Sequence, residues 1–211
     1  MSSPLIVLER AVALSQALDA AGLRHAIGGA LALGYHVSEP RGTRDIDVNV
    51  SVDPDDARRL FDSLPKQIQW SRADVDRAVR DGQVRLFWPV HDELPLPVDL
   101  FLPQHAFHGV VAGRSEIVPM LDTQVPVLSA TDLTIFKALF DRRKDWGDIE
   151  ALLRFGKVDQ QEVVRWLSSI VGPGDDRIGR FNGLAREVAQ PSGDVPVAAV
   201  LFGRRKPRLG D

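Results

Sequence analysis

The chain has 211 residues, of which 44% are hydrophobic and 26% are charged, and its formal net charge at pH 7 is −3. This composition is that of an ordinary globular protein with enough length to bury a core, and the negative charge argues against nucleic-acid binding through bulk electrostatics. The absence of cysteine excludes disulfides, thiolate zinc sites and cysteine nucleophiles, and without a run of about 18 apolar residues we predict a cytoplasmic protein with no membrane span.

The first predicted elements are a helix, a strand and a second helix. Apolar side chains recur at helical spacing over residues 4–22, and "RHAI" at 24–27 has the character of a short strand. This strand runs directly into Gly28 and Gly29, after which "ALALGYH" continues as a helix. A tight turn explains most glycine pairs. A strand that ends in glycines and opens a helix also lets the backbone approach a ligand, with free N–H groups available for phosphate oxygens.

The next predicted strand, "DIDVNVSV", carries two acidic residues on one face. Side chains alternate along a strand, so Asp45 and Asp47 point the same way, about 6.5 Å apart at their Cα atoms. The residues Ile46, Val48, Val50 and Val52 occupy the other face. One interpretation is a half-buried strand whose polar face meets water. The other is a pair of carboxylates placed for chemistry.

The remaining elements divide the chain into three parts. A helix is predicted after Pro54, followed by two strands in "GQVRLFWPV" and "PLPVDLFLP", and helical periodicity dominates from Ser129 onward. We therefore predict an α/β (α+β) core at residues 1–128, a helical C-terminal part at 129–195 and a basic tail at 196–211. His105 and His108 fall in a predicted loop and are interpreted as ordinary polar residues, and His25 and His36 as structural ones.

A third carboxylate, Asp99, lies in the second of these strands, opposite the face that holds Leu96, Val98, Leu100 and Leu102. A carboxylate among apolar neighbours needs a partner, because burying an unpaired charge is costly. Taken alone, Asp99 could be exposed on an edge strand or paired with an arginine. Together with Asp45 and Asp47 beside a glycine turn, it would form a site for hard divalent cations such as Mg²⁺, which prefer oxygen ligands.

These segments resemble a known family. The stretch "GGALALGYHVSEPRGTRDIDVNV" followed by "VDLF" is similar to the nucleotidyltransferase superfamily of the DNA polymerase β type, in which two glycines or Gly-Ser precede a helix, two aspartates and a later third carboxylate. The pattern R-x-T-x-D-I-D and the later "K…DRRKDWGDIEAL" look most like the AbiEii-type toxins. The resemblance covers about residues 24–155 and implies a mixed sheet flanked by helices, with a helical C-terminal part.

The resemblance also implies roles for individual residues. Gly28 and Gly29 would bind the triphosphate, and Asp45, Asp47 and Asp99 would bind magnesium, with Asp99 also helping to deprotonate the acceptor. Many members carry a serine after the first glycine, whereas this chain has Gly29 followed by Ala30, so that backbone N–H groups would make the phosphate contacts alone.

Five further residues are carried over less directly from the family. Lys137 would extend to the triphosphate, although a lysine at this position could instead pair with Asp141 on an exposed helical face. Arg41 and Thr43 would contact phosphate or fix the loop. The implied substrate contacts Asp145 and Asp148 could instead pair with neighbouring basic residues, namely Arg142, Arg143 and Lys144.

The function that follows is transfer of a nucleoside monophosphate from a nucleoside triphosphate to an acceptor hydroxyl, with Mg²⁺ as cofactor. The resemblance makes a tRNA 3′ end, a protein or a small molecule the candidate acceptors, and a toxin with a cognate antitoxin a candidate role. The alternative is an inactive module of the same fold that binds or regulates, as an antitoxin does. A purely structural domain would make the glycines and three aspartates a coincidence.

Overall fold

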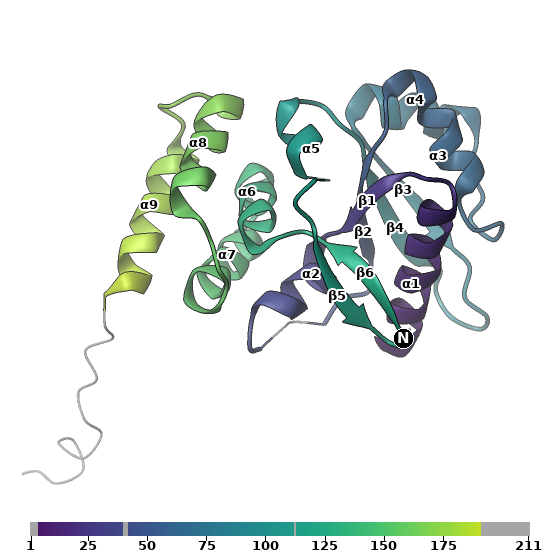
Figure 1. Cartoon of the computed structure of the whole chain (residues 1–211), viewed down its shortest axis with the longest axis horizontal. Coiled ribbons are helices and arrows are strands. Elements are labelled where there is room, and N and C mark those ends of the chain that lie inside the picture. The colour runs from purple at the N-terminus through teal and green to yellow at the C-terminus, as the bar shows by residue number, and fades with distance from the viewer. Residues whose placement is uncertain (1–3, 40–41, 112, 191–211) are drawn as a thin grey trace, which may run out of the picture.

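The computed structural model describes residues 4–39, 42–111 and 113–190 (Figure 1). The described elements in chain order are α1 (Pro4–Ala20), β1 (Arg24–Ile27), α2 (Gly29–His36), β2 (Ile46–Ser51), the 3₁₀ turn η1 (Pro54–Asp56), α3 (Ala57–Ser63), α4 (Arg72–Asp81), β3 (Gln83–Trp88), β4 (Leu96–Phe101), α5 (Ala106–Val111), β5 (Glu116–Met120), β6 (Thr123–Val127), α6 (Ala130–Phe140), α7 (Arg143–Phe155), α8 (Gln160–Val171) and α9 (Asp176–Ala189). Arg41 and the basic residues of the tail lie outside the described ranges.

Within these ranges the strands form a single mixed sheet in the order β3-β4-β2-β1-β6-β5. Two pairs, β2 with β4 and β1 with β6, are parallel, and the other neighbours are antiparallel. Figure 1 shows α1, α3 and α4 on one side of this sheet and α6 to α9 on the other. The prediction of a mixed sheet flanked by helices, with a helical C-terminal part, is confirmed.

The apolar faces predicted from periodicity form the core. In β2 the residues Ile46, Val48 and Val50 are buried while the alternate side chains are half-buried. Helix α1 buries the stripe Val7, Ala11, Leu14 and Leu18. Each such aliphatic side chain contributes about 1.5–3 kcal/mol when fully removed from water, so this layer fixes the orientation of β2 and sends its aspartates to the opposite face.

Two histidines beside the glycine turn are held by internal hydrogen bonds. His25 is buried and its ring nitrogens lie 2.8 Å from the Ser15 hydroxyl and 3.0 Å from the Leu23 carbonyl. His36 Nε2 lies 2.8 Å from the Leu128 carbonyl oxygen, joining the end of α2 to the end of β6. The structural interpretation of both histidines is confirmed.

Several elements differ from the sequence-based prediction. The hairpin of β5 and β6 and the helix α4 are not predicted. Helix α4 does have a capping residue pair at its N-terminus, because the Asp74 carboxylate accepts a hydrogen bond from the Ser71 backbone N–H at 2.9 Å. His108 lies within α5, so the prediction of a loop at this residue is wrong. Burial, reinforced by the neighbouring His105, lowers the pKa of His108 to about 4, which keeps its ring neutral.

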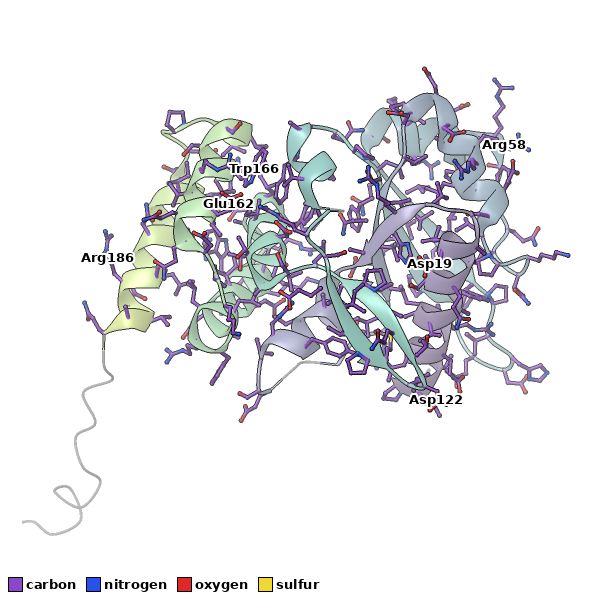
Figure 2. All side chains as sticks on the ribbon, in the orientation of Figure 1. Asp19, Arg58, Asp122, Glu162, Trp166 and Arg186 are labelled. Atoms are coloured by element: carbon purple, nitrogen blue, oxygen red, sulfur yellow. The ribbon has the colours of Figure 1, made fainter. Side chains whose placement is uncertain are left out.

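The helical part is joined to the segment before β5 by a partly buried charge cluster. Ser129 caps α6 by accepting from the Asp132 backbone N–H at 3.1 Å, and the Asp132 carboxylate accepts two hydrogen bonds from Arg114. Arg114 also donates to Glu162 of α8 at 2.7 Å, and Glu162 in turn accepts from the Trp166 indole beside it (Figure 2). None of the helices in the described part of the chain is long and apolar enough to span a membrane.

Candidate active site

The predicted acidic residues meet at one cleft because of the register of three neighbouring strands. In the parallel pair β2 and β4, Asp47 lies directly opposite Asp99, and in the antiparallel pair β3 and β4, Asp99 lies opposite Arg85. These three residues therefore form a row across the sheet on one face, the face turned away from α1. Asp45 immediately precedes β2 and lines the same cleft.

The glycine turn packs directly on Asp47. The Gly28 backbone N–H donates to the Asp47 carbonyl oxygen at 2.8 Å, and Gly29 has a φ of +56°, a conformation that side chains other than glycine rarely adopt. A Cβ atom at Gly29 would lie 1.7 Å from Asp47 Oδ2. The second glycine is therefore required both by the backbone conformation and by the carboxylate beneath it.

Helix α2 begins at this turn, and its first N–H groups have no partner within the helix. Because Gly29 lines the cleft, these groups lie at the edge of the same space as the carboxylates. A helix N-terminus favours negative charge, so the cleft combines one feature that attracts phosphate with carboxylates that attract cations.

Asp45 is held by its own loop. The Thr43 hydroxyl donates to the Asp45 carboxylate, and the Asp45 backbone N–H lies 3.4 Å from the Thr43 oxygen. This arrangement matches the predicted alternative in which Thr43 fixes the loop before the strand. Its other predicted role, contact with phosphate, stays a prediction.

The Asp47 carboxylate has a raised pKa in the folded chain. Its pKa is raised from 3.8 to about 6, chiefly by burial and in addition by the negative charges of Asp45 and Asp99, while the positive charges of Lys137 and Arg142 act in the opposite direction. No residue in the described ranges forms a hydrogen bond or an ion pair with its carboxylate. A half-buried carboxylate in this state would be stabilised by an added cation.

Asp99 differs, because it already has a cationic partner. Arg85 donates to Asp99 through two nitrogens, Nε to Oδ1 at 2.8 Å and Nη2 to Oδ2 at 2.5 Å. Asp99 is 2% exposed, and its strand β4 lies inside the sheet between β3 and β2. Of the two alternatives considered for Asp99 alone, the arginine pair is correct and the exposed edge strand is wrong.

Two other cations of the cleft, Lys137 and Arg142, are also paired with aspartates. Lys137 Nζ lies 2.6 Å from Asp148 Oδ2, and both residues are buried. The alternative of an exposed helical face for Lys137 is therefore wrong, because α7 folds back and covers it. Arg142 donates through Nε to Asp145 Oδ2 at 2.7 Å, which is the pairing considered for Asp145 from the sequence.

The cleft has a volume of about 400 Å³ and extends from the carboxylates to an apolar wall. The wall includes Phe101 and Phe140, whose ring centroids are 5.6 Å apart, and the Arg142 guanidinium lies 4.9 Å from the centroid of Phe140. Asn49 lines the cleft as well, and its buried Oδ1 has no hydrogen-bond partner among the described residues.

Sequence reasoning missed Arg85, Asn49 and the two phenylalanines as cleft residues. Asn49 and Phe101 each follow an aspartate by two positions, and this spacing could have identified them. Arg85 carries no such signal, because its place depends on how β3 pairs with β4.

The carboxylates suit a divalent ion only in part. In the described portion of the chain, no three acidic or histidine side chains converge closely enough to surround one ion. Asp45 and Asp47 remain suitable as two oxygen ligands, because magnesium is usually held by one or two carboxylates together with substrate phosphates and water. The donor set therefore fits an ion that arrives with a phosphate ligand.

Comparison with solved structures identifies the architecture. An antigenic nucleotidyltransferase-like protein from Paracoccidioides brasiliensis aligns with a TM-score of 0.51 and 19% sequence identity, over 86% of this chain and 94% of that chain. The chain has a nucleotidyltransferase-like fold. JHP933 from Helicobacter pylori aligns at a lower TM-score of 0.43 and 12% identity, over 89% of this chain and 93% of that chain. No protein-family model and no curated protein sequence matches the chain.

The nucleotidyltransferase-like fold accounts for the common location of the predicted residues. Asp47 and Asp99 lie on β2 and β4, Asp45 immediately precedes β2, and Gly28 and Gly29 form the turn between β1 and α2. Gly29 and the three aspartates line the cleft. Lys137 and Asp145 line the opposite side from the helical part, and Asp148 lies behind Lys137. Of the predicted substrate contacts, only Arg41 lies outside the described residues.

Proposed function

We propose that the protein is a magnesium-dependent nucleotidyltransferase. The observation that carries the proposal is the Asp47 carboxylate, which lies under Gly29 at the start of α2, has a raised pKa and forms no hydrogen bond or ion pair with a residue in the described ranges. A structural domain gains nothing from this arrangement, because the unpaired charge only destabilises it. A site for a divalent ion and a triphosphate explains the glycine and the carboxylate together.

In this proposal Asp45 and Asp47 would hold magnesium. The bound ion would supply charge neutralisation for the triphosphate and for the oxygens of the displacement. The N–H groups at the start of α2 would bind phosphate oxygens, and Lys137 and Arg142 would add positive charge from the helical part. The two phenylalanines, Phe101 and Phe140, would offer flat apolar surfaces to the nucleobase.

The reaction would form a bond between the acceptor oxygen and the α-phosphorus while the bond from that phosphorus to the β-phosphate oxygen breaks. Pyrophosphate would leave, and the proton of the acceptor hydroxyl would pass to a carboxylate or to water. Transfers of this kind depend mainly on positioning and charge stabilisation, which are what the paired and unpaired charges of this cleft provide.

The acceptor class and the biological role rest on the resemblance of the motifs. The R-x-T-x-D-I-D pattern supports membership in the AbiEii-type branch, and thus a toxin with a cognate antitoxin in the cytoplasm. A tRNA 3′ end and a protein side chain are then the first acceptors to test, with a small molecule as the third. The division into residues 1–128, 129–195 and 196–211 stays a prediction.

The test is a transfer assay with each of the four α-labelled nucleoside triphosphates, magnesium, and total RNA, total protein or a small-molecule extract as acceptor. We expect label in one fraction with the wild type, none with Asp45→Ala or Asp47→Ala, and wild-type transfer with Asp122→Ala, which removes an exposed carboxylate far along the sheet (Figure 2). Absence of transfer together with absence of magnesium-dependent nucleotide binding would refute the proposal and favour an inactive binding module.

A further inference from the structure

Asp99 is bound in a way that separates it from Asp45 and Asp47. Both of its oxygens accept hydrogen bonds from one guanidinium, that of Arg85, and its side chain is 3% exposed whereas that of Arg85 is 53% exposed. The carboxylate is thus a buried anchor, and the arginine extends from it into the cleft. Asp47, directly opposite on β2, has no such partner among the described residues.

The same arrangement occurs at another position of the cleft wall. Arg142, with a side chain 56% exposed, is held by Asp145, with a side chain 0% exposed. Both arginines line the cleft, one from β3 and one from the start of α7. By its environment Asp99 therefore belongs with Asp145, as a buried carboxylate that fixes an exposed arginine.

An arginine fixed in this way retains donors for a ligand. A guanidinium has five N–H groups, and Asp99 engages Arg85 through Nε and Nη2, which leaves the Nη1 donors. Because the carboxylate already orients the planar group, binding an anion would cost less side-chain entropy than it would for a free arginine. Phosphate oxygens are suitable ligands for such a group.

A metal ion on Asp99 would have to displace these contacts. The ion would replace two charge-assisted hydrogen bonds and would lie beside the positive charge of Arg85, which disfavours a second divalent cation. The Arg85 guanidinium therefore occupies the place that a second ion would take, and it neutralises the charge of the Asp99 carboxylate.

We propose that Asp99 is a positioning residue that holds Arg85 toward the triphosphate, and that Asp45 and Asp47 carry a single divalent ion. This inference rests on the proposed function and makes it more specific, because it assigns the third carboxylate to nucleotide binding through an arginine. It predicts one ion for each chain in the presence of nucleotide, and it makes Arg85 and Asp99 act as one unit.

The test counts ions and measures affinity without turnover. The full chain is titrated with Mn²⁺ and with the non-transferable analogue α,β-methylene ATP, and bound Mn²⁺ is followed by electron paramagnetic resonance and heat of binding by calorimetry. We expect one Mn²⁺ per chain in the wild type and none in Asp47→Asn. We expect Arg85→Met to retain the ion and to bind the analogue about tenfold more weakly, as for loss of one exposed charge-assisted contact.

The pair is tested by a double-mutant cycle. Asp99→Asn should also retain the ion and bind the analogue more weakly than the wild type does. The double variant should bind the analogue no more weakly than Arg85→Met alone. Arg80→Met is the matched control, because Arg80 makes the same two-nitrogen contact with Asp81 on α4, outside the cleft, and its removal should leave both measurements unchanged. Arg85→Lys, which keeps the charge, serves if Arg85→Met does not fold.

Each outcome decides between the assignments. Two bound Mn²⁺ in the wild type, with one lost in Asp99→Asn, would overturn the inference and leave the proposed function intact. Unchanged analogue affinity in Arg85→Met would also overturn it. Absence of any Mn²⁺ or analogue binding in the wild type would refute the proposed function itself, and the inference with it.

Discussion

Replacing Asp47 by asparagine should stabilise the protein at neutral pH while it abolishes metal binding. The pKa of Asp47 is about 6 in the folded chain against an ordinary value of 3.8, so the folded state binds this proton more tightly than the unfolded state. The wild type therefore loses stability as the pH rises through this interval. Each tenfold change in proton affinity corresponds to about 1.4 kcal/mol, which gives about 3 kcal/mol above pH 6.

Asparagine has nearly the same shape as a neutral aspartic acid, so the variant should escape this loss. The free energy of unfolding is measured by urea titration of both proteins, without divalent ions, at several values between about pH 4 and pH 8. We expect the two proteins to be equally stable near pH 4 and the variant to be more stable by about 2–3 kcal/mol at pH 8. Asp122→Asn, which alters an exposed carboxylate, should show no such trend.

A stability difference that does not depend on pH, or a variant less stable than the wild type at pH 8, would refute the reasoning. Either result would mean that a partner in the folded chain compensates the Asp47 charge. Adding Mg²⁺ with a nucleotide should reverse the order of stability, because only the wild type gains binding energy.

Two further substitutions test the structures around the cleft. Gly29→Ala places a methyl group 1.7 Å from Asp47 Oδ2 at a residue with a positive φ. We expect the free energy of unfolding, measured in a thermal melt, to fall by about 1–2 kcal/mol, and Mn²⁺ binding to weaken at least tenfold. Gly147→Ala, at an open helical position, should leave both measurements unchanged. Lys137→Met removes the ion pair that Lys137 forms with the buried Asp148 carboxylate. In urea titration it should lower the free energy of unfolding by about 3 kcal/mol. An effect below about 1 kcal/mol would show that the pair is not buried in solution.

The faces of the acidic strands can be predicted from the sequence. Strict alternation in β2 and β4 fixes the side on which Asp47 and Asp99 lie, because the apolar side chains must enter the core. Their proximity cannot be derived in this way, because strand order and register are set by the packing of the whole sheet. Arg85 lies in a predicted strand, yet its contact with Asp99 follows only from the pairing of β3 with β4.

The missed elements lack the patterns on which prediction depends. Strand β5 contains Pro119, which lowers the expectation of a strand and is tolerated because β5 lies at the edge of the sheet. Helix α5 has six residues, too few for a helical period to emerge, and it is held in place by the burial of Phe107 and Val111. Lys137 lies on a helix as predicted, but its burial depends on α7, which the sequence of α6 does not reveal.

The walls of the cleft come from two parts of the chain. Asp47 and Arg85 belong to the sheet, whereas Lys137 lies on α6 and Arg142 directly precedes α7. A transient detachment of α6 and α7 would therefore remove half of the site while the sheet stays folded, and the equilibrium of that opening would set the fraction of competent molecules. A ligand that contacts both walls would disfavour this opening, and its binding would be detected as slower amide hydrogen exchange in α6.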